Sequence, residues 1–242
     1  MRATPRVEPS CWSWARNVDD HVLFEVTAAI TSIAHRRLTT AAKVQDVLFG
    51  GTATDTTLIE TFIDRVSDKA VEYCRLARDP TGTFPTFGRE TCRATWAPLS
   101  NGLRGHELIL PWRVPVSSIT SVVEDGETLV LSTDYQLAGA GILERLSETN
   151  RVRWSSAAIV VVYVAGFDLA TASAVPPALE AAVIDQVKVM YQTRRRDITL
   201  RSEQVPDVYT AAYSIAGGDS IGESGLMVQV ESALGQYKNW FV

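Results

Sequence analysis

The sequence contains few of the residues from which metal centres and disulfide frameworks are built. Among 242 residues there are only three cysteines and three histidines. The cysteines show no C-x-x-C spacing, which argues against a disulfide framework and against a zinc site. The histidines are far apart and have no cysteine or carboxylate partners at ligand spacing. We therefore expect no metal, and a reducing cytosol is the simplest location for the chain.

The sequence also lacks an excess of positive charge and a long apolar run. Its formal net charge is −5, from 23 basic and 28 acidic residues, so it is a poor candidate for tight, non-specific binding to nucleic acid. The longest apolar run, Ala157 to Ala165, is far shorter than the roughly 20 residues of a membrane helix. Residues 1–16 have no apolar core of a signal peptide. These features predict a soluble, non-secreted protein without a membrane partner.

Catalytic motifs are missing as well. The sequence has no G-x-x-x-x-G-K-[ST] phosphate loop and no G-x-S-x-G nucleophile elbow. Gly139-Ala140-Gly141 lies between predicted strands and is better interpreted as a turn than as a phosphate-binding loop. We therefore expect no enzymatic activity, no catalytic residue and no cofactor. A small hydrolase with a scattered site stays open as an alternative.

Apolar residues recur at helical spacing in several segments. Residues 41–49 follow Thr39-Thr40 and end at Gly50-Gly51, which predicts a short helix. Residues 57–78 begin with a capping box and place Cys74 on an apolar stripe, as expected of a buried structural thiol. Residues 177–196 begin with proline and end in three arginines, which suit a helix terminus or a non-specific phosphate contact.

Short extended segments fill the region between the second and third of these helices, about 91–167. Asp125-Gly126 between two such segments predicts a hairpin with a type I′ turn. The run Ala157 to Val164 is apolar at every position, so we expect a central strand that is covered on both faces. The predicted class is therefore α+β: a small α-helical bundle with an inserted antiparallel β-sheet region and an extended C-terminal arm ending in a helix.

The two ends of the chain have patterns of their own. Residues 1–37 form an N-terminal extension in which Val22 to Ala34 predicts a helix, either packed on the domain or used as a partner-binding arm. Residues 38–197 form the main domain, and 198–224 are a polar, glycine-containing linker. Residues 225–242 predict an amphipathic helix that either docks on another chain or folds back on its own domain. We favour docking, through Leu226, Met227, Val230, Leu234, Tyr237, Trp240 and Phe241.

The order of these elements resembles one family of virion proteins. A capped helix is followed by a β region that opens with Leu-Pro-x-x-x-Pro-Val, and then by a proline-started helix that ends in arginines. In this order, residues 38–197 resemble the head–tail connector (adaptor) proteins of long-tailed bacteriophages and gene transfer agents. The segments that carry the resemblance are Thr39-Thr40, Glu72-Tyr73-Cys74, Leu110-Pro111, Pro115-Val116, Asp125-Gly126, Asp134-Tyr135, Tyr163 to Phe167, Val175-Pro176, Ala178-Leu179 and Tyr191 with Arg194.

The resemblance implies a structural role in the neck of a virion. It implies a homo-oligomeric ring, usually dodecameric, that sits beneath the portal protein and receives a stopper or tail-completion protein at its other end. DNA would pass through the channel without specific binding, and the protein would be made in the cytoplasm of a bacterial host. Portal contact maps onto residues 225–242, and the turn Glu124-Asp125-Gly126 is a candidate ring or tail-side contact. Another neck or tail-completion component, such as a stopper or a minor tail protein, is the alternative.

Overall fold

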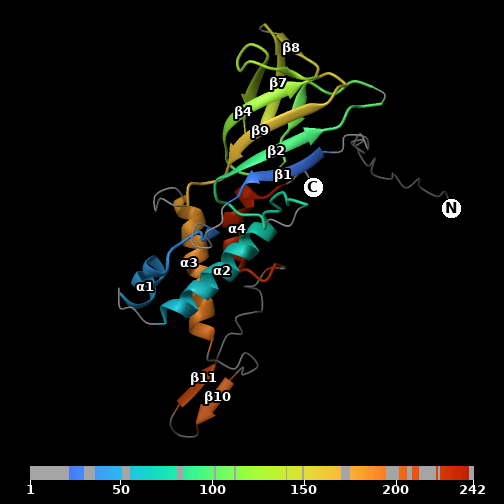
Figure 1. Ribbon diagram of the computed structural model, residues 1–242. Helices are drawn as coiled ribbons and strands as arrows, with labels where there is room; N and C mark the ends of the chain where they lie inside the picture. The colour runs from blue at the N-terminus through green and yellow to red at the C-terminus, as the bar shows by residue number, and fades with distance from the viewer. Residues whose placement is uncertain are drawn as a thin grey trace, which may run out of the picture.

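The computed structural model describes most of the chain. The described residues are 22–29, 36–50, 55–80, 84–100, 102–111, 113–139, 141–148, 150–169, 175–194, 202–205, 209–212, 222 and 224–239. The two larger sheets form one end of the molecule and the helices lie beneath them (Figure 1).

Within the described residues, four α-helices pack around one apolar core. They are α1 (Ala41–Phe49), α2 (Thr56–Tyr73), α3 (Pro177–Thr193) and α4 (Val228–Leu234), and a 3-10 turn, η2 (Gly235–Tyr237), follows α4. Their core joins α2 and α3, far apart in sequence, through fully buried side chains that include Ile59, Ile63, Leu179, Val183 and Leu234. We call this part of the molecule the helical layer.

The bounds of α1 agree with the predicted helix 41–49. The Thr40 hydroxyl accepts a hydrogen bond from the Lys43 backbone N–H at 3.4 Å, and Gly50 closes the helix in the left-handed conformation with φ 65°. A threonine at the N-cap and a glycine at the C-terminal end are local signals, so the sequence alone located both ends.

The predicted bounds of α2 and α3 need correction. The capping box at Thr57 is not the start of α2, because Asp55 occupies the N-cap position and makes no side-chain capping bond. Its carboxylate instead accepts a hydrogen bond from the Tyr191 hydroxyl at 3.1 Å, so a contact with α3 replaces the local cap. At the other end α2 stops at Tyr73 rather than residue 78, and Arg75 has a positive φ of 54°. Helix α3 ends at Thr193 rather than residue 196.

A five-stranded antiparallel sheet forms the larger half of the β region. Its strand order is β1-β2-β9-β4-β5, with β9 at the centre. The bounds are β1 Val22–Ala28, β2 Glu90–Trp96, β4 Val116–Glu124, β5 Glu127–Thr128 and β9 Ile159–Ala165. The predicted central position of the apolar run near residue 160 is confirmed. Only one face of β9 is fully buried, since Val160, Val162 and Val164 on the other face are partly exposed.

A second antiparallel sheet packs on the first. Its order is β3-β7-β6, and β8 pairs with β7; the bounds are β3 Glu107–Ile109, β6 Tyr135–Ala138, β7 Ile142–Ser147 and β8 Asn150–Val152. Side chains from both sheets, including Trp96, Leu143, Trp154, Val161 and Tyr163, form a second apolar core. The chain thus has one core in the helical layer and another between its sheets.

The helix expected from Val22 to Ala34 is wrong for its first half, which is β1. The strand pairs antiparallel with β2, from Val22 opposite Trp96 to Ala28 opposite Thr91, and it buries Phe24 on the sheet core. The sequence Val-Leu-Phe-Glu-Val-Thr is rich in β-branched and aromatic residues that fit a sheet. The apolar spacing suited a helix, but pairing with a strand some seventy residues away decided the outcome. Residues 30–35 lie outside the described part of the chain.

Both predicted turns of the β region are found. Asp125 and Gly126 have φ values of 52° and 81° and join β4 to β5, as a type I′ hairpin requires. Gly139 and Gly141 also have positive φ and join β6 to β7. The strand β5 is short and ends at Thr128.

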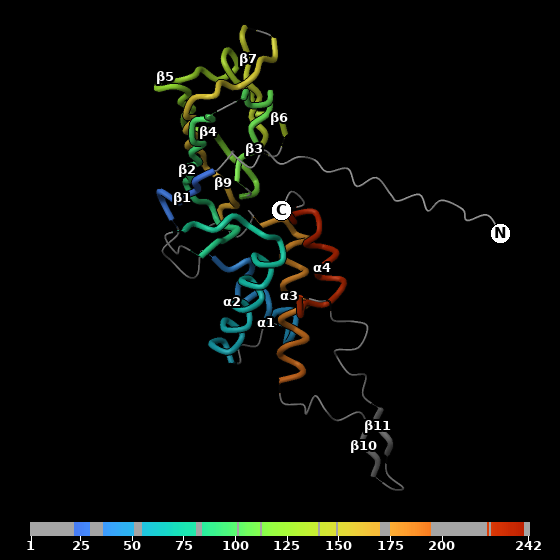
Figure 2. The backbone as a smooth tube through the Cα atoms, turned by 90° about the vertical axis from the view of Figure 1, so that its right-hand side faces the viewer, coloured from blue at the N-terminus to red at the C-terminus, as the bar shows by residue number. Residues whose placement is uncertain are grey.

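The helices and the two packed sheets occupy largely separate stretches of the chain. Strands β2 to β9 lie between α2 and α3 in sequence, whereas β1 precedes α1, and in Figure 2 the two packed sheets stand above the helices. The mixed α+β class is confirmed. The small α-helical bundle with an inserted antiparallel β-sheet region is not confirmed, because strands make up slightly more of the described regular structure than helices do. The predicted linker contains a hairpin, β10 (Ser202–Val205) with β11 (Tyr209–Ala212), beyond the end of α3 (Figure 1).

Candidate interaction surfaces

The turn Glu124-Asp125-Gly126 combines one buried residue with two exposed ones. Glu124 is 8 % exposed, and its carboxylate accepts hydrogen bonds from Arg145 Nε at 2.8 Å and from the Ser155 backbone N–H at 2.7 Å. Burial by itself would raise the pKa of Glu124, but these hydrogen bonds outweigh it and the pKa is lowered. Glu124 therefore ties β4 to β7, and only Asp125 and Gly126 are available for a ring or tail-side contact, which stays a prediction.

The C-terminal segment folds back on the helical layer. Leu226, Val230 and Leu234 are at most 1 % exposed and belong to the core with α2 and α3. The backbone N–H of Met227 also donates to the Gln186 side chain on α3 at 2.8 Å. For these three side chains the structure thus shows folding back on the chain's own domain, which was the alternative to docking on another chain.

The remaining residues of the expected portal contact differ in their surroundings. Met227 and Tyr237 are partly exposed. Tyr237 also stacks edge-on against Phe87 and Phe167, with ring centroids 6.3 and 6.2 Å away. Trp240 and Phe241 lie outside the described residues. Portal binding through this segment stays a prediction, and within the described part it concerns Met227 and Tyr237.

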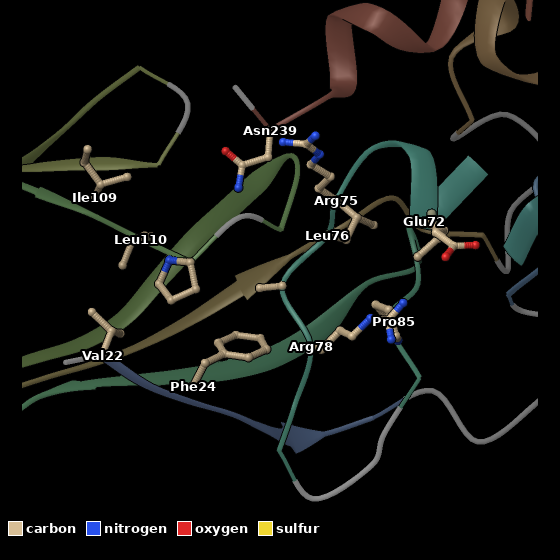
Figure 3. Close-up of a pocket in the computed structure, with 13 residues that line it drawn as sticks. Val22, Phe24, Glu72, Arg75, Leu76, Arg78, Pro85, Ile109, Leu110 and Asn239 are labelled. Atoms are coloured by element: carbon tan, nitrogen blue, oxygen red, sulfur yellow. The ribbon is translucent and has the colours of Figure 1, made fainter. Parts of the chain in front are cut away.

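A cleft of about 560 Å³ lies where the helical layer meets the sheets (Figure 3). Its apolar wall comes from Val22 and Phe24 of β1 and from the segment around Leu110, and Arg75 and Arg78 approach from beyond α2. Asn239 also lines the cleft, near Arg75 in Figure 3, and its backbone N–H donates to the Cys74 carbonyl at 2.9 Å. The lining residues comprise no nucleophile with a neighbouring base, so the cleft suits packing or binding rather than catalysis.

A second groove, of about 550 Å³, runs between α2 and α3 beside the start of α4. Val189, Met190 and Leu226 give it an apolar base, and Arg65 and Lys69 lie at its α2 side. Sequence reasoning did not single out this groove. The charged face of α2 was visible as a pattern, but its proximity to α3 depends on the tertiary structure.

The cysteines and histidines and the arginine run 194–196 are not assembled into a reactive site in the part of the chain that the structure describes. Cys74 and Cys92 are buried free thiols, and burial raises the pKa of each to about 12, which disfavours the thiolate. His106 is exposed, whereas His21, His35, Cys11 and the final two arginines of the run 194–196 lie outside the described residues. No group of three or more potential ligands is close enough to hold a metal ion among the described residues. No helix in the same ranges is long and apolar enough to cross a membrane.

Arg113 is a buried charge that the sequence analysis missed. It stands inside the Leu-Pro-x-x-x-Pro-Val motif and is 3 % exposed. Its Nη1 donates to the Thr86 carbonyl at 3.0 Å and lies 3.4 Å from the Glu90 carboxylate, and the guanidinium lies over the Phe24 ring. Arg113 thus joins the motif to β1 and β2, and its role is structural.

The sequence matches no family model and no curated protein. Among solved structures, it is similar to a chain from the virion of a native gene transfer agent particle, with 15 % identity over 91 % of this chain and 97 % of that chain and a TM-score of 0.48. It is also similar to a chain from the neck of an empty gene transfer agent particle computed with C6 symmetry, with 17 % identity over 90 % and 96 % of the two chains and a TM-score of 0.47. A third is from the neck of the native particle computed with C12 symmetry, with 16 % identity, 90 % and 96 % coverage and a TM-score of 0.45.

Proposed function

We propose that the chain is a structural protein of a virion neck, a head-to-tail connector that assembles as a ring beneath the portal protein. One observation carries the proposal. The helical layer is built from α1 and α2, which precede strands β2 to β9 in sequence, and from α3 and α4, which follow them. This order supports the resemblance to the connector family, whose features were an early capped helix, an inserted β region and a proline-started helix.

The chemistry of the surface supports the same role. The grooves and exposed side chains are suited to contact with other proteins, and the acidic net charge of −5 suits a channel through which DNA passes without being held. In this role the ring number is proposed to be twelve. The partners are the portal at one end and a stopper or tail-completion protein at the other.

The alternative is a stopper or another tail-completion protein. The observation that favours it is the pair of packed sheets, since the described residues are divided about equally between strand and helix and β-rich architectures are more typical of those components than of connectors. The two roles differ in the partner they bind first. A connector binds the portal, whereas a stopper requires a connector ring to be present.

The test is the mass of the purified full-length chain, alone and mixed with the portal protein of the same particle. A connector is expected to form a ring on the portal, visible as one complex of defined mass and as a ring in electron micrographs. A chain that ignores the portal but joins a preformed portal–connector complex would overturn the connector role in favour of the stopper. A chain that binds neither would contradict the proposed function altogether.

Portal contact by the C-terminal segment needs point variants rather than a deletion, because a deletion would also remove core residues. Met227→Ala and Tyr237→Ala change the partly exposed side chains, and Val228→Ala is a matched exposed control. Weaker portal binding by the first two is the expected result. Because Tyr237→Ala also removes ring contacts with Phe87 and Phe167, binding is measured well below the melting temperature of each variant. Binding equal to that of Val228→Ala would contradict the assignment.

A further inference from the structure

Helix α1 leaves apolar side chains exposed next to an acidic one. Its inner side chains, such as Val44, belong to the core, but Val47 is 52 % exposed and Phe49 is 36 % exposed. These two lie on different sides of the helix, because positions two residues apart do not share a face, and Phe49 packs against Tyr191 of its own chain. Asp46, next to Val47, is exposed and takes part in no ion pair with the other described residues. Val47 and Asp46 are therefore the side chains that α1 offers to another protein.

The groove between α2 and α3 has complementary properties. Its base is apolar, with Val189 and Met190 partly exposed, and Arg65 and Lys69 stand on its α2 side beside the single acid Asp68. Neither cation has an ion-pair partner among the residues that the structure describes. At the α4 end, Gly225 leaves room for the Lys69 ammonium, which lies 2.8 Å from the place where a Cβ atom would stand.

These two surfaces lie on opposite sides of the helical layer. On α3, Glu180 and Tyr191 face α1, as shown by the Lys43–Glu180 ion pair of 2.7 Å and the edge contact of Phe49 with Tyr191. The groove uses Val189 and Thr193, which the period of about 100° per residue places on the far side of α3. On α2, Thr56 bonds to Gln45 of α1, whereas Arg65 and Lys69 point to the groove. One copy therefore cannot bring its own α1 into its own groove.

We infer that the occupant of the groove is α1 of a second copy of this chain. In this contact Val47 covers Val189 and Met190, and Asp46 lies against Arg65 and Lys69. Because the two surfaces differ and face in opposite directions, the contact is heterologous and repeats from copy to copy, which closes into a ring when the rotation permits. The inference rests on the proposed function, since it supplies the subunit interface of the ring.

Cysteine cross-linking tests the geometry. In a Cys11→Ser background, Val47→Cys and Met190→Cys are introduced singly and together, and the full chain is oxidised alone and with the portal protein. The native Cys74 and Cys92 are buried and unreactive. The double variant is expected to give a ladder of covalent multimers, and a mixture of the two single variants only dimers. The pair Val130→Cys with Met190→Cys is the matched control, because Val130 is 58 % exposed but lies in the β region, and it should give no ladder.

Charge reversal tests the complementarity. Asp46→Lys alone and Lys69→Glu alone are each expected to weaken self-association by about fivefold or more. The two changes in one chain restore an opposite-charge pair at every interface and should recover most of the loss. Both positions are exposed, so the melting temperature serves as the check that folding is unchanged.

The outcomes separate the interface from the function. Oligomers or rings that give no ladder with the double variant, or charge changes that show no mutual rescue, overturn the interface and leave the connector role standing. Dimers from Val47→Cys alone would indicate a symmetric contact and also overturn it. A chain that stays monomeric with and without portal protein contradicts both proposals.

Discussion

At the scale of single residues, two ion pairs with buried carboxylates join segments of the β region. Arg113 and Glu90 are almost fully buried, yet they face each other across β2 and the proline-flanked motif. Glu124 and Arg145 form a second, partly buried pair at the opposite end of β4. Such pairs contribute little net stability, but removal of one partner leaves the other charge in an apolar environment. These positions are therefore sensitive to substitution.

Arg113→Met is expected to lower the free energy of unfolding by about 3–5 kcal/mol, because it removes the cation that faces the buried Glu90 carboxylate. Chemical denaturation of the purified variant measures the loss. The double variant Arg113→Met/Glu90→Leu should recover most of it. Arg93→Ala, which removes a half-exposed pair with Glu25, is the control and should cost less than about 1 kcal/mol. Equal losses for Arg113→Met and Arg93→Ala would refute the framework role of Arg113.

The lowered pKa of Glu124 predicts a dependence of stability on pH. Its ordinary value is 4.5, so its carboxylate contributes fully above about pH 4.5, and the contribution is lost as pH falls through the lower pKa of the folded state. The free energy of unfolding of the native chain and of Glu124→Gln, measured from pH 7 to pH 3, should differ most at neutral pH. The difference should shrink below pH 4.5, and a gap that widens on acidification would contradict the assignment.

At the scale of elements, local signals located the helix α1 and the hairpin turns. Thr40 and Gly50 bound α1, and Asp125-Gly126 bounds the β4–β5 hairpin, because each residue acts on backbone groups within a few positions of itself. The elements that sequence reasoning misassigned depend on distant partners. Strand β1 forms by pairing with β2, and the start of α2 is set by the contact of Asp55 with Tyr191.

Two glycines with positive φ provide a matched pair of element-scale variants. Gly166 follows β9, with φ 101°, and a Cβ atom there would stand 2.1 Å from the Gly88 carbonyl oxygen. Gly50 ends α1, with φ 65°, and has open space around it. Gly50→Ala should lower the free energy of unfolding by about 1 kcal/mol, from backbone strain alone. Gly166→Ala should cost about 3 kcal/mol or more, because the backbone must also move. Thermal melting of both variants measures the difference, and similar costs would contradict the close approach.

At the scale of the whole molecule, two cores share one chain. The helical core depends on three segments that are distant in sequence, and the β core lies between two sheets. Phe87, Phe167 and Tyr237 meet at the junction of the two units. The C-terminal segment is therefore part of the framework at its buried face, and any partner reaches it only through its outer residues.

Truncation after residue 224 is expected to destabilise the helical layer selectively. It removes Leu226, Val230 and Leu234, and loss of each large core side chain typically costs 2–5 kcal/mol. Hydrogen exchange should show loss of protection in α2 and α3, whereas β2 and β9 remain protected because their core is separate. Val228→Ala in the full chain, at a position 49 % exposed, is the control with little expected change. Unchanged protection of α2 after truncation would show that the segment is dispensable for the fold.

The sequence by itself determined the elements whose causes are local: the caps of α1, the proline start of α3, both glycine turns and the apolar central strand. It also determined the mixed α+β class, because helical and extended patterns occupy separate stretches of the chain. Only the tertiary structure decided what the apolar faces of the amphipathic segments pack against. Apolar spacing shows that a face will be covered but not by what, so Val22 to Ala28 became an edge strand, and Leu226, Val230 and Leu234 were buried within their own chain. The placement of α1 and the α2–α3 groove on opposite sides of the helical layer likewise follows from how the helices pack, which the sequence alone does not show.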